Sequence, residues 1–295
     1  MWAPLLTFGP ARSGPGLSVP APTLGRMGWY TPTTVTPDLA GTLVCAWSAR
    51  TQGRHLLVPD GCIDVLWIPG VGVRVCGPET TAWSFALPPG TESFGIRFRP
   101  GFAPHVLRTS AAQIRDTRVG LADVLGSAAE RTLVDRLEHT DGDAARLAVL
   151  QAAGRRWLGA RPDPDPLAAR ITAALSVHSW SVDALADASS MTGRQLQRRC
   201  NDAFGYGPST LRSILRLQRF MHLARADRGR GLAALAADAG YSDQAHLSRE
   251  CRRIATVTPT ELLAGEAPDW HGGASVLDVR SMQDRAVPGH GESAA

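Results

Sequence analysis

The sequence contains no lysine, so all 31 of its basic residues are arginine. It also has no apolar run near the roughly 20 residues that a membrane span needs. The N-terminal stretch has too short an apolar segment for a signal peptide, and Pro and Gly interrupt it. We therefore expect a cytoplasmic protein that does not associate with membranes.

Cysteine is also scarce, and the five cysteines form no CxxC pair. This excludes a zinc ribbon and a closed disulfide framework, so we expect reduced thiols. The eight histidines are scattered singly, and no G-x-S-x-G, P-loop or HExxH motif occurs. The sequence therefore predicts no enzyme, no cofactor and no metal site. The net charge is only +4, so any case for DNA binding depends on where the arginines lie.

The pattern of apolar residues changes along the chain. Residues 42–108 carry short runs rich in Val, Ile, Phe and Trp between Gly/Pro turns, typical of a small antiparallel sheet or barrel. Residues 120–159 and 167–264 show helical patterning, and "RPDPDP" at 161–166 is the best linker. This predicts an α+β protein: a β-rich, barrel-like N-terminal domain, a helical connector and an all-α C-terminal domain with two helix-turn-helix units. The predicted boundaries are 1–163, 164–264 and a flexible tail at 265–295.

The helical region contains an internal repeat. "LADASSMTGRQLQRRCNDAFGYGP" (185–208) and "LAADAGYSDQAHLSRECRRIATVTP" (235–259) run in parallel. Four pairs of identical residues lie 51 positions apart: Leu196 and Leu247, Arg198 and Arg249, Cys200 and Cys251, Pro208 and Pro259. A duplicated unit of about 50 residues is the simplest explanation.

Each copy reads as a helix, a tight turn and a second helix, which is the helix-turn-helix plan. In the first copy Thr192 and Gln195 fit a capping box that opens the second helix. In the second copy we expect Ser242 to be the N-cap and Gly240 to end the preceding helix in left-handed conformation. A further helix is predicted to begin at "TPTE" (258–261), which also fits a capping box.

The second helix of each copy has one apolar side. Counting 100° per residue, the inward positions are Leu196, Cys200 and Ala203 in the first copy and Leu247, Cys251 and Ile254 in the second. The outward positions are Arg194, Arg198 and Asn201, with Gln197 beside them, and Ser242, Ala245, Arg249 and Arg252. Arginine and amide side chains read guanine and adenine edges. The matching faces therefore favour DNA contact over a solvated surface.

Between the copies, "PSTLRSILRLQRFMHLARA" predicts one long helix. Arg212, Arg216 and Arg219 lie on it at i, i+4 and i+7. Such a stripe suits contact with DNA phosphates, which position a protein without reading sequence. A solvated helix face is the alternative. Arg252 is the fourth residue that we expect at a phosphate.

The C-terminal region resembles the DNA-binding domain of the AraC/XylS family of bacterial transcription regulators over about 167–264. "GYSDQAHLSRECRRIATVTPTELL" is similar to the family signature of Gly, aromatic, Ser, Asp, then Ser-Arg-x-Phe-Lys/Arg, then Gly-x-Thr-Pro-x-Glu. Cys200 and Cys251 stand where the family usually has Phe. Thr256 replaces the usual Gly, which Gly205 keeps in the first copy.

This resemblance implies a sequence-specific DNA-binding transcription regulator whose two units enter successive major grooves of double-stranded DNA over about 20 base pairs. It also implies RNA polymerase as a partner. Of the base-reading positions, we expect Arg198 and Arg249 at guanine, and Gln197 and Gln244 at adenine. The full implied set is Arg194, Gln197, Arg198, Gln244, Ala245, His246, Ser248 and Arg249.

The N-terminal half, through "VPDGCIDVLWIPG", "VCGPETTAW" and "FGIRFRPGFAPHVL", resembles a domain found fused to such regulators, whose ligand is generally unassigned. We expect it to bind a small-molecule effector and to support a homodimer. Two alternatives stay open: a domain that only dimerises, and a metal-dependent catalytic domain fused to the DNA-binding module. Cys62 and Asp64 are candidates for a metal or redox sensor, but the cysteine spacings match no metal motif and buried structural cysteine is commoner.

Overall fold

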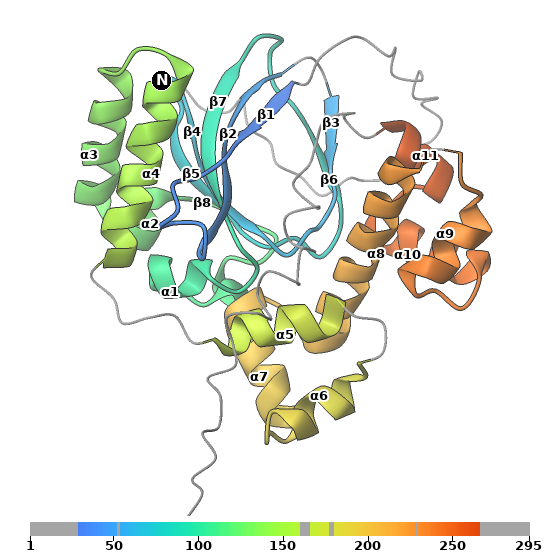
Figure 1. Ribbon diagram of the computed structural model, residues 1–295. Helices are drawn as coiled ribbons and strands as arrows, with labels where there is room; N and C mark the ends of the chain where they lie inside the picture. The colour runs from blue at the N-terminus through green and yellow to red at the C-terminus, as the bar shows by residue number, and fades with distance from the viewer. Residues whose placement is uncertain (1–28, 52–53, 160–165, 177–179, 228, 266–295) are drawn as a thin grey trace, which may run out of the picture.

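The structure is a computed structural model of the 295-residue chain, and it describes residues 29–51, 54–159, 166–176, 180–227 and 229–265. An antiparallel sheet with helices on one face forms the N-terminal half, and helices alone form the C-terminal half (Figure 1). The predicted α+β fold class is therefore confirmed. Most of the predicted linker and almost all of the predicted tail lie outside the described residues.

The N-terminal sheet forms because short β-branched and aromatic runs alternate with turns. Six strands pair in the order β1-β2-β7-β4-β5-β8, and β3 and β6 form a separate two-stranded sheet. β7 therefore lies in the middle, between β2 and β4, although it follows both in sequence. The strand bounds are β1 Tyr30–Thr33, β2 Leu43–Arg50, β3 Arg54–Leu57, β4 Ile63–Ile68, β5 Gly72–Cys76, β6 Trp83–Ala86, β7 Glu92–Phe98 and β8 Arg118–Gly120.

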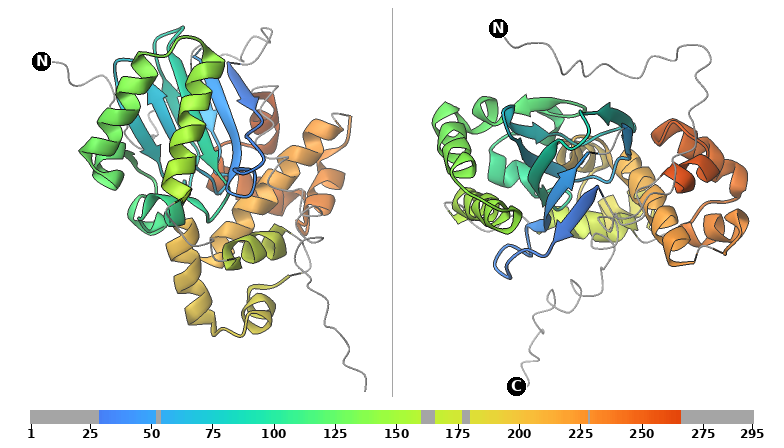
Figure 2. Two further views of the ribbon diagram at one scale, coloured as in Figure 1. Left: turned by 60° about the vertical axis from the view of Figure 1, so that its left-hand side comes forward. Right: turned by 90° about the horizontal axis from the view of Figure 1, so that it is seen from above.

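Helices α3 and α4 cover one face of the large sheet (Figures 1 and 2). Successive side chains of a strand point to opposite faces, so β7 sends Phe94, Ile96 and Phe98 to this side, where they are buried with Leu137 and Leu150. The predicted helical connector at 120–159 is thereby confirmed. The helical elements of this half are α1 Ala103–Leu107, η1 Ala111–Gln113, α2 Leu121–Leu125, α3 Ser127–Glu138 and α4 Asp143–Gly159.

The C-terminal half contains two helix pairs, α6–α7 and α9–α10, on either side of the long helix α8. Leu211, Ile214 and Leu215 of α8 are buried in the core that both pairs share. The two copies of the sequence repeat are thus two copies of the same helix pair. The bounds are α5 Leu167–Ser176, α6 Val182–Ala188, α7 Gly193–Phe204, α8 Pro208–Ala226, α9 Leu232–Ala239, α10 Gln244–Ile254 and α11 Pro259–Gly265.

Most of the predicted helix ends are confirmed. Thr192 and Gln195 form the capping box of α7, with Gln195 N donating to Thr192 Oγ1 at 3.2 Å and Thr192 N to Gln195 Oε1 at 2.8 Å. Residues 258 and 261 make the same reciprocal pair before α11. Gly240 ends α9 in left-handed conformation, with φ 93°.

The predicted N-cap of α10 is wrong by one residue. Asp243 is the cap, because its backbone is extended and its Oδ1 accepts a hydrogen bond from His246 N at 2.6 Å. Ser242 lies outside the helix and places its hydroxyl 3.1 Å from His246 Nδ1. A carboxylate accepts more strongly than a hydroxyl, and its charge is stabilised at a helix N-terminus.

Among the helices of the described residues, none combines the length and the apolar character that a membrane span requires.

Candidate nucleic-acid interface

Helices α7 and α10 each bury one side and expose the other, as their sequences predict. Leu196 and Cys200 of α7, and Leu247 and Cys251 of α10, are fully buried at 0% exposure. Burial raises the pKa of the thiols of Cys200 and Cys251 to about 12, so both thiols are neutral at physiological pH. The two cysteines therefore fill equivalent places in the repeated core.

Six of the eight predicted base-reading residues are exposed on these two helices. On α7 the amide of Gln197 folds toward the helix end, where its Nε2 lies 3.4 Å from Asn201 Oδ1. The Gln197 amide therefore has its described partner within α7 itself. The exposed set is Arg194, Gln197 and Arg198 on α7 with Gln244, Ala245 and Arg249 on α10.

The other two predicted readers, His246 and Ser248, are half-buried. The His246 ring packs edge-on against Tyr241, with 5.2 Å between the ring centroids. Its two nitrogens lie 3.1 Å from Ser242 Oγ and 3.3 Å from Arg216 Nη2. His246 thus makes contacts within the protein on several sides, and it has less freedom to reach a base than Arg249 does.

Arg216, a predicted phosphate contact, lies between α8 and α10. Its Nε donates to Glu250 Oε1 at 3.1 Å, its Nη2 also pairs with Glu250, and its guanidinium lies 4.5 Å from the centroid of the Tyr241 ring. Glu250 is only 6% exposed and also accepts hydrogen bonds from Tyr241 and Ser213. The charge of Arg216 is therefore neutralised inside the protein, and its described contacts fix α10 against α8.

The remaining predicted phosphate contacts differ in exposure. Arg252 is exposed on α10, whereas Arg212 and Arg219 of α8 are half-buried. The Nε of Arg219 donates to the carbonyl oxygen of Asp238 at 3.0 Å, near the end of α9. Arg252 therefore has the greatest freedom to meet a phosphate.

Two family models match the chain. Residues 185–265 match a helix-turn-helix domain, and residues 33–120 match a domain of unknown function, DUF6597. The C-terminal region is a helix-turn-helix domain of the AraC type. The chain is accordingly a DNA-binding transcription regulator.

Among solved structures, the regulator is similar to ToxT of Vibrio cholerae. ToxT from strain O395 is 9% identical, with 80% of this chain and 97% of that chain covered and a TM-score of 0.40. Wild-type ToxT from strain SCE256, with unsaturated fatty acid bound, is 10% identical, with 75% and 94% covered and a TM-score of 0.41. No curated protein matches the regulator.

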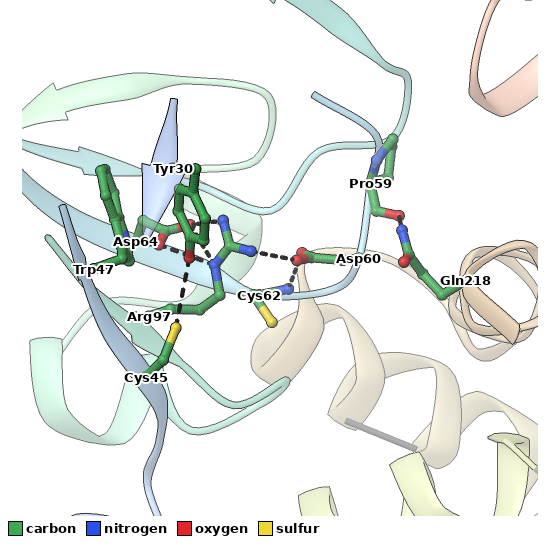
Figure 3. A network of polar contacts seen from close by, with 9 residues as sticks. All are labelled: Tyr30, Cys45, Trp47, Pro59, Asp60, Cys62, Asp64, Arg97 and Gln218. Carbon is green, nitrogen blue, oxygen red and sulfur yellow. Dashed lines mark hydrogen bonds and ion pairs between the residues drawn. The ribbon is translucent and has the colours of Figure 1, made fainter. Parts of the chain in front are cut away.

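In the N-terminal half of the regulator, the sheet face opposite α3 and α4 holds a buried ionic cluster (Figure 3). Arg97 of β7 donates to both oxygens of Asp64, with Nε at 3.0 and 3.2 Å, and to Asp60 at 3.2 Å. Trp47 Nε1 donates to the same Asp64 at 2.8 Å, and the Arg97 guanidinium lies 5.9 Å from the centroid of the Tyr30 ring. This cluster explains the acidic residue at position 64 within an apolar strand.

The cluster also affects the pKa of the Cys62 thiol. Burial raises the pKa of its thiol well above the usual value, and the negative charge of Asp60 raises it further. Cys45 and Cys62 are both buried free thiols. Within the described residues, no group of three His, Cys, Asp or Glu residues is placed to hold a metal ion.

Sequence reasoning missed two residues here. Arg97 was not predicted, because its partners lie on another strand and in a turn, at least 33 residues away in sequence. The burial of Glu250 could have been predicted from the sequence, because this residue lies three positions after Leu247 and hence beside the buried stripe of α10. An acidic residue in such a place calls for a basic partner.

Proposed function

We propose that the regulator binds one asymmetric DNA site sequence-specifically, with α7 and α10 entering successive major grooves. The observation that supports this is the match between two capped helices of the same buried pattern, each exposing arginine and glutamine side chains on the face away from the core. Two such helices one helical turn apart on DNA would cover about 20 base pairs.

The proposed readers divide by chemistry. Arg198 and Arg249 present a guanidinium fork that fits the O6 and N7 atoms of guanine, and Gln197 and Gln244 present an amide that fits adenine. The remaining proposed contacts to bases are Arg194, Ala245, His246 and Ser248, and those to phosphates are Arg212, Arg219 and Arg252. Arg216 is proposed as a positioning residue, since it is paired with Glu250.

Selection of bound fragments from random double-stranded DNA with the purified full chain tests this proposal. The expected product is one asymmetric motif with two information-rich blocks whose centres lie about 10 base pairs apart. Enrichment of a single block would show that only one helix reads bases. No enrichment above the input library would overturn sequence-specific binding altogether.

We also propose that the N-terminal half binds a small effector at the sheet face opposite α3 and α4. Aromatic and charged side chains gather on this face, among them the buried Tyr30, Trp47 and Arg97 and the half-buried Asp64 (Figure 3). A ligand that binds the folded state raises Tm with its concentration, so a thermal-shift screen of the full chain against metabolites tests the idea. A true effector should lose its shift in Asp64→Asn, and uniformly null screens would favour a domain that only dimerises.

Homodimerisation and contact with RNA polymerase are proposed on the family resemblance. Light scattering of the full chain at several concentrations tests the first, and a mass of about 31 kDa throughout would refute it. Pull-down of purified polymerase, with and without promoter DNA, tests the second. The division into residues 1–163 and 164–264 is also a proposal, because Val58 and Ala82 of the first segment are buried in the core of the second.

A further inference from the structure

The N-terminal half contacts the C-terminal half through several segments, three of which meet the C-terminal ends of α7 and α10 or the helix α8. These three are the loop 77–82 between β5 and β6, the turn 59–61 before β4, and Arg115 after η1. The views agree that α8 lies between the sheet and the second helix pair (Figures 1 and 2). The two halves therefore share an extended seam.

The first contact is at the end of α7. Arg115 Nη1 donates to the carbonyl oxygen of Gly205, the C-cap of α7, at 2.9 Å. Pro78 packs on the same glycine so closely that a Cβ at Gly205 would lie 2.6 Å from Pro78 Cγ. Helix α7 is thus fixed to the N-terminal half at its C-terminal end.

The second contact is at the end of α10, and the same loop makes it. Ala82 N donates to the carbonyl oxygen of Ile254, the last residue of α10, at 2.6 Å. Ala82 is only 6% exposed and belongs to the core of the C-terminal half. Residues 77–82 therefore contact the C-terminal ends of both α7 and α10.

The third contact is on α8, which connects the two helix pairs. Gln218 Nε2 donates to the carbonyl oxygen of Pro59 at 2.8 Å, and Gln218 is buried (Figure 3). Asp60 holds this turn in place, because it accepts hydrogen bonds from Cys62 N at 2.8 Å and from Arg97 at 3.2 Å. The buried ionic cluster of the sheet thereby stiffens the contact with α8.

These contacts leave the reading faces free. The described contacts touch the C-terminal ends of α7 and α10, whereas Arg194, Arg198, Gln244 and Arg249 are exposed on the rest of the two helices. The seam therefore holds the two helices without covering their proposed DNA-contacting side chains.

We propose that the N-terminal half is a spacing clamp, which holds α7 and α10 at one separation so that the regulator accepts only one distance between the two halves of its DNA site. The proposal rests on the proposed function, since it requires both helices to read bases. Its physical reason is preorganisation: a fixed pair of helices loses less freedom on binding than a mobile pair, and it tolerates other spacings less well.

Binding to a DNA panel tests the clamp. The panel contains the selected site and versions with one or two base pairs inserted or deleted between its two blocks. The wild-type chain should bind the altered spacings at least about tenfold more weakly. Ala82→Pro removes the N–H that bonds to Ile254, and Gln218→Glu replaces the donor to Pro59 with a carboxylate beside Asp60. Both variants should bind the original site more weakly and should discriminate spacings by less than about threefold.

A measurement without DNA accompanies the panel. Spin labels at two exposed positions, Asp187→Cys on α6 and Ala237→Cys on α9, report the separation of the helix pairs by pulsed electron paramagnetic resonance. The distance distribution should be narrow in the wild-type background and broad in both clamp variants. His222→Gln, at a half-exposed position on α8, is the matched control and should change neither readout.

The outcomes separate the two proposals. A wild-type chain that selects no DNA motif would overturn the proposed function. A wild-type chain that selects a motif, together with folded clamp variants that keep a narrow distance and the same spacing preference, would overturn the clamp alone. Circular dichroism identifies a variant that does not fold, and the other variant, which acts at a different contact, then decides.

Discussion

Replacing Thr256 by glycine should stabilise the C-terminal half. Thr256 follows α10 with φ 64°, in the left-handed region that β-branched residues rarely occupy. Its counterpart in the first copy is Gly205, with φ 83°, so both turns need the same backbone and only one has the residue that suits it. The chain thus carries strain at Thr256 that its own repeat avoids.

The expected gain follows from two opposing effects. A left-handed backbone conformation at a non-glycine residue destabilises the fold by roughly 1–2 kcal/mol. Glycine loses more conformational freedom on folding, which offsets roughly 0.5–1 kcal/mol of the gain in stability. The Thr256 side chain is exposed, and among the described residues its hydroxyl donates to the carbonyl oxygen of the adjacent Ala255, so its loss costs little. The net gain should be about 0.5–1 kcal/mol, or about 2 °C in Tm.

Calorimetry of the full chain measures this shift, with Thr260→Gly as the matched control. Thr260 is equally exposed but lies within α11, where glycine should lower stability by about 0.5 kcal/mol. The converse change, Gly205→Thr, should destabilise by at least about 2 kcal/mol, because it adds strain and a clash with Pro78. If Thr256→Gly lowered Tm as much as Thr260→Gly does, the strain argument would be refuted.

Three further predictions concern α10 and the repeated core. Arg249→Ala should weaken binding to the selected site by about 1–3 kcal/mol and relax the base preference at one position. The exposed control Arg253→Ala should leave that preference unchanged. Gel shifts with single-base variants of the site measure both effects. Arg252→Ala should weaken all sequences alike and reduce the salt dependence of log Kd by about one unit, and a sequence-selective loss would contradict a phosphate role. The Cys200 thiol, whose pKa burial raises to about 12, should resist iodoacetamide in the folded protein at pH 8 and react after denaturation; rapid native labelling by mass spectrometry would contradict a core role.

The sequence predicted what depends on local spacing. The inward positions of α7 and α10 follow from a 3.6-residue period, and Leu196, Cys200, Leu247 and Cys251 are buried as that period requires. The caps at Thr192 and 258–261 also depend only on neighbours three residues away. The cap of α10 was missed by one residue because Ser242 and Asp243 are both good capping residues and spacing alone does not rank them.

The sequence did not predict what depends on packing between distant elements. Arg216 and Glu250 lie 34 positions apart in sequence, and their pair joins α8 to α10. The arginine spacing on α8, taken alone, favoured a role in contacting phosphates. Strand order placed Arg97 against Asp64, because β7 inserts between β2 and β4 although it follows both in the chain. No periodicity encodes such an order, since each strand would show the same alternation in any position.

The same reasoning applies to the seam between the two halves. Ala82 and Pro78 are unremarkable loop residues in sequence, and Gln218 falls on the inward side of α8, where an apolar residue would be expected. A buried amide needs a partner, and that of Gln218 finds the carbonyl oxygen of Pro59 in the other half of the chain. Its burial in a helix otherwise lined with leucine, isoleucine and phenylalanine is therefore a sign that α8 packs against something besides its own helix pairs. The outward faces of α7 and α10 can be inferred from these two helices alone, whereas the contacts that join their ends to the N-terminal half depend on the fold of the whole chain.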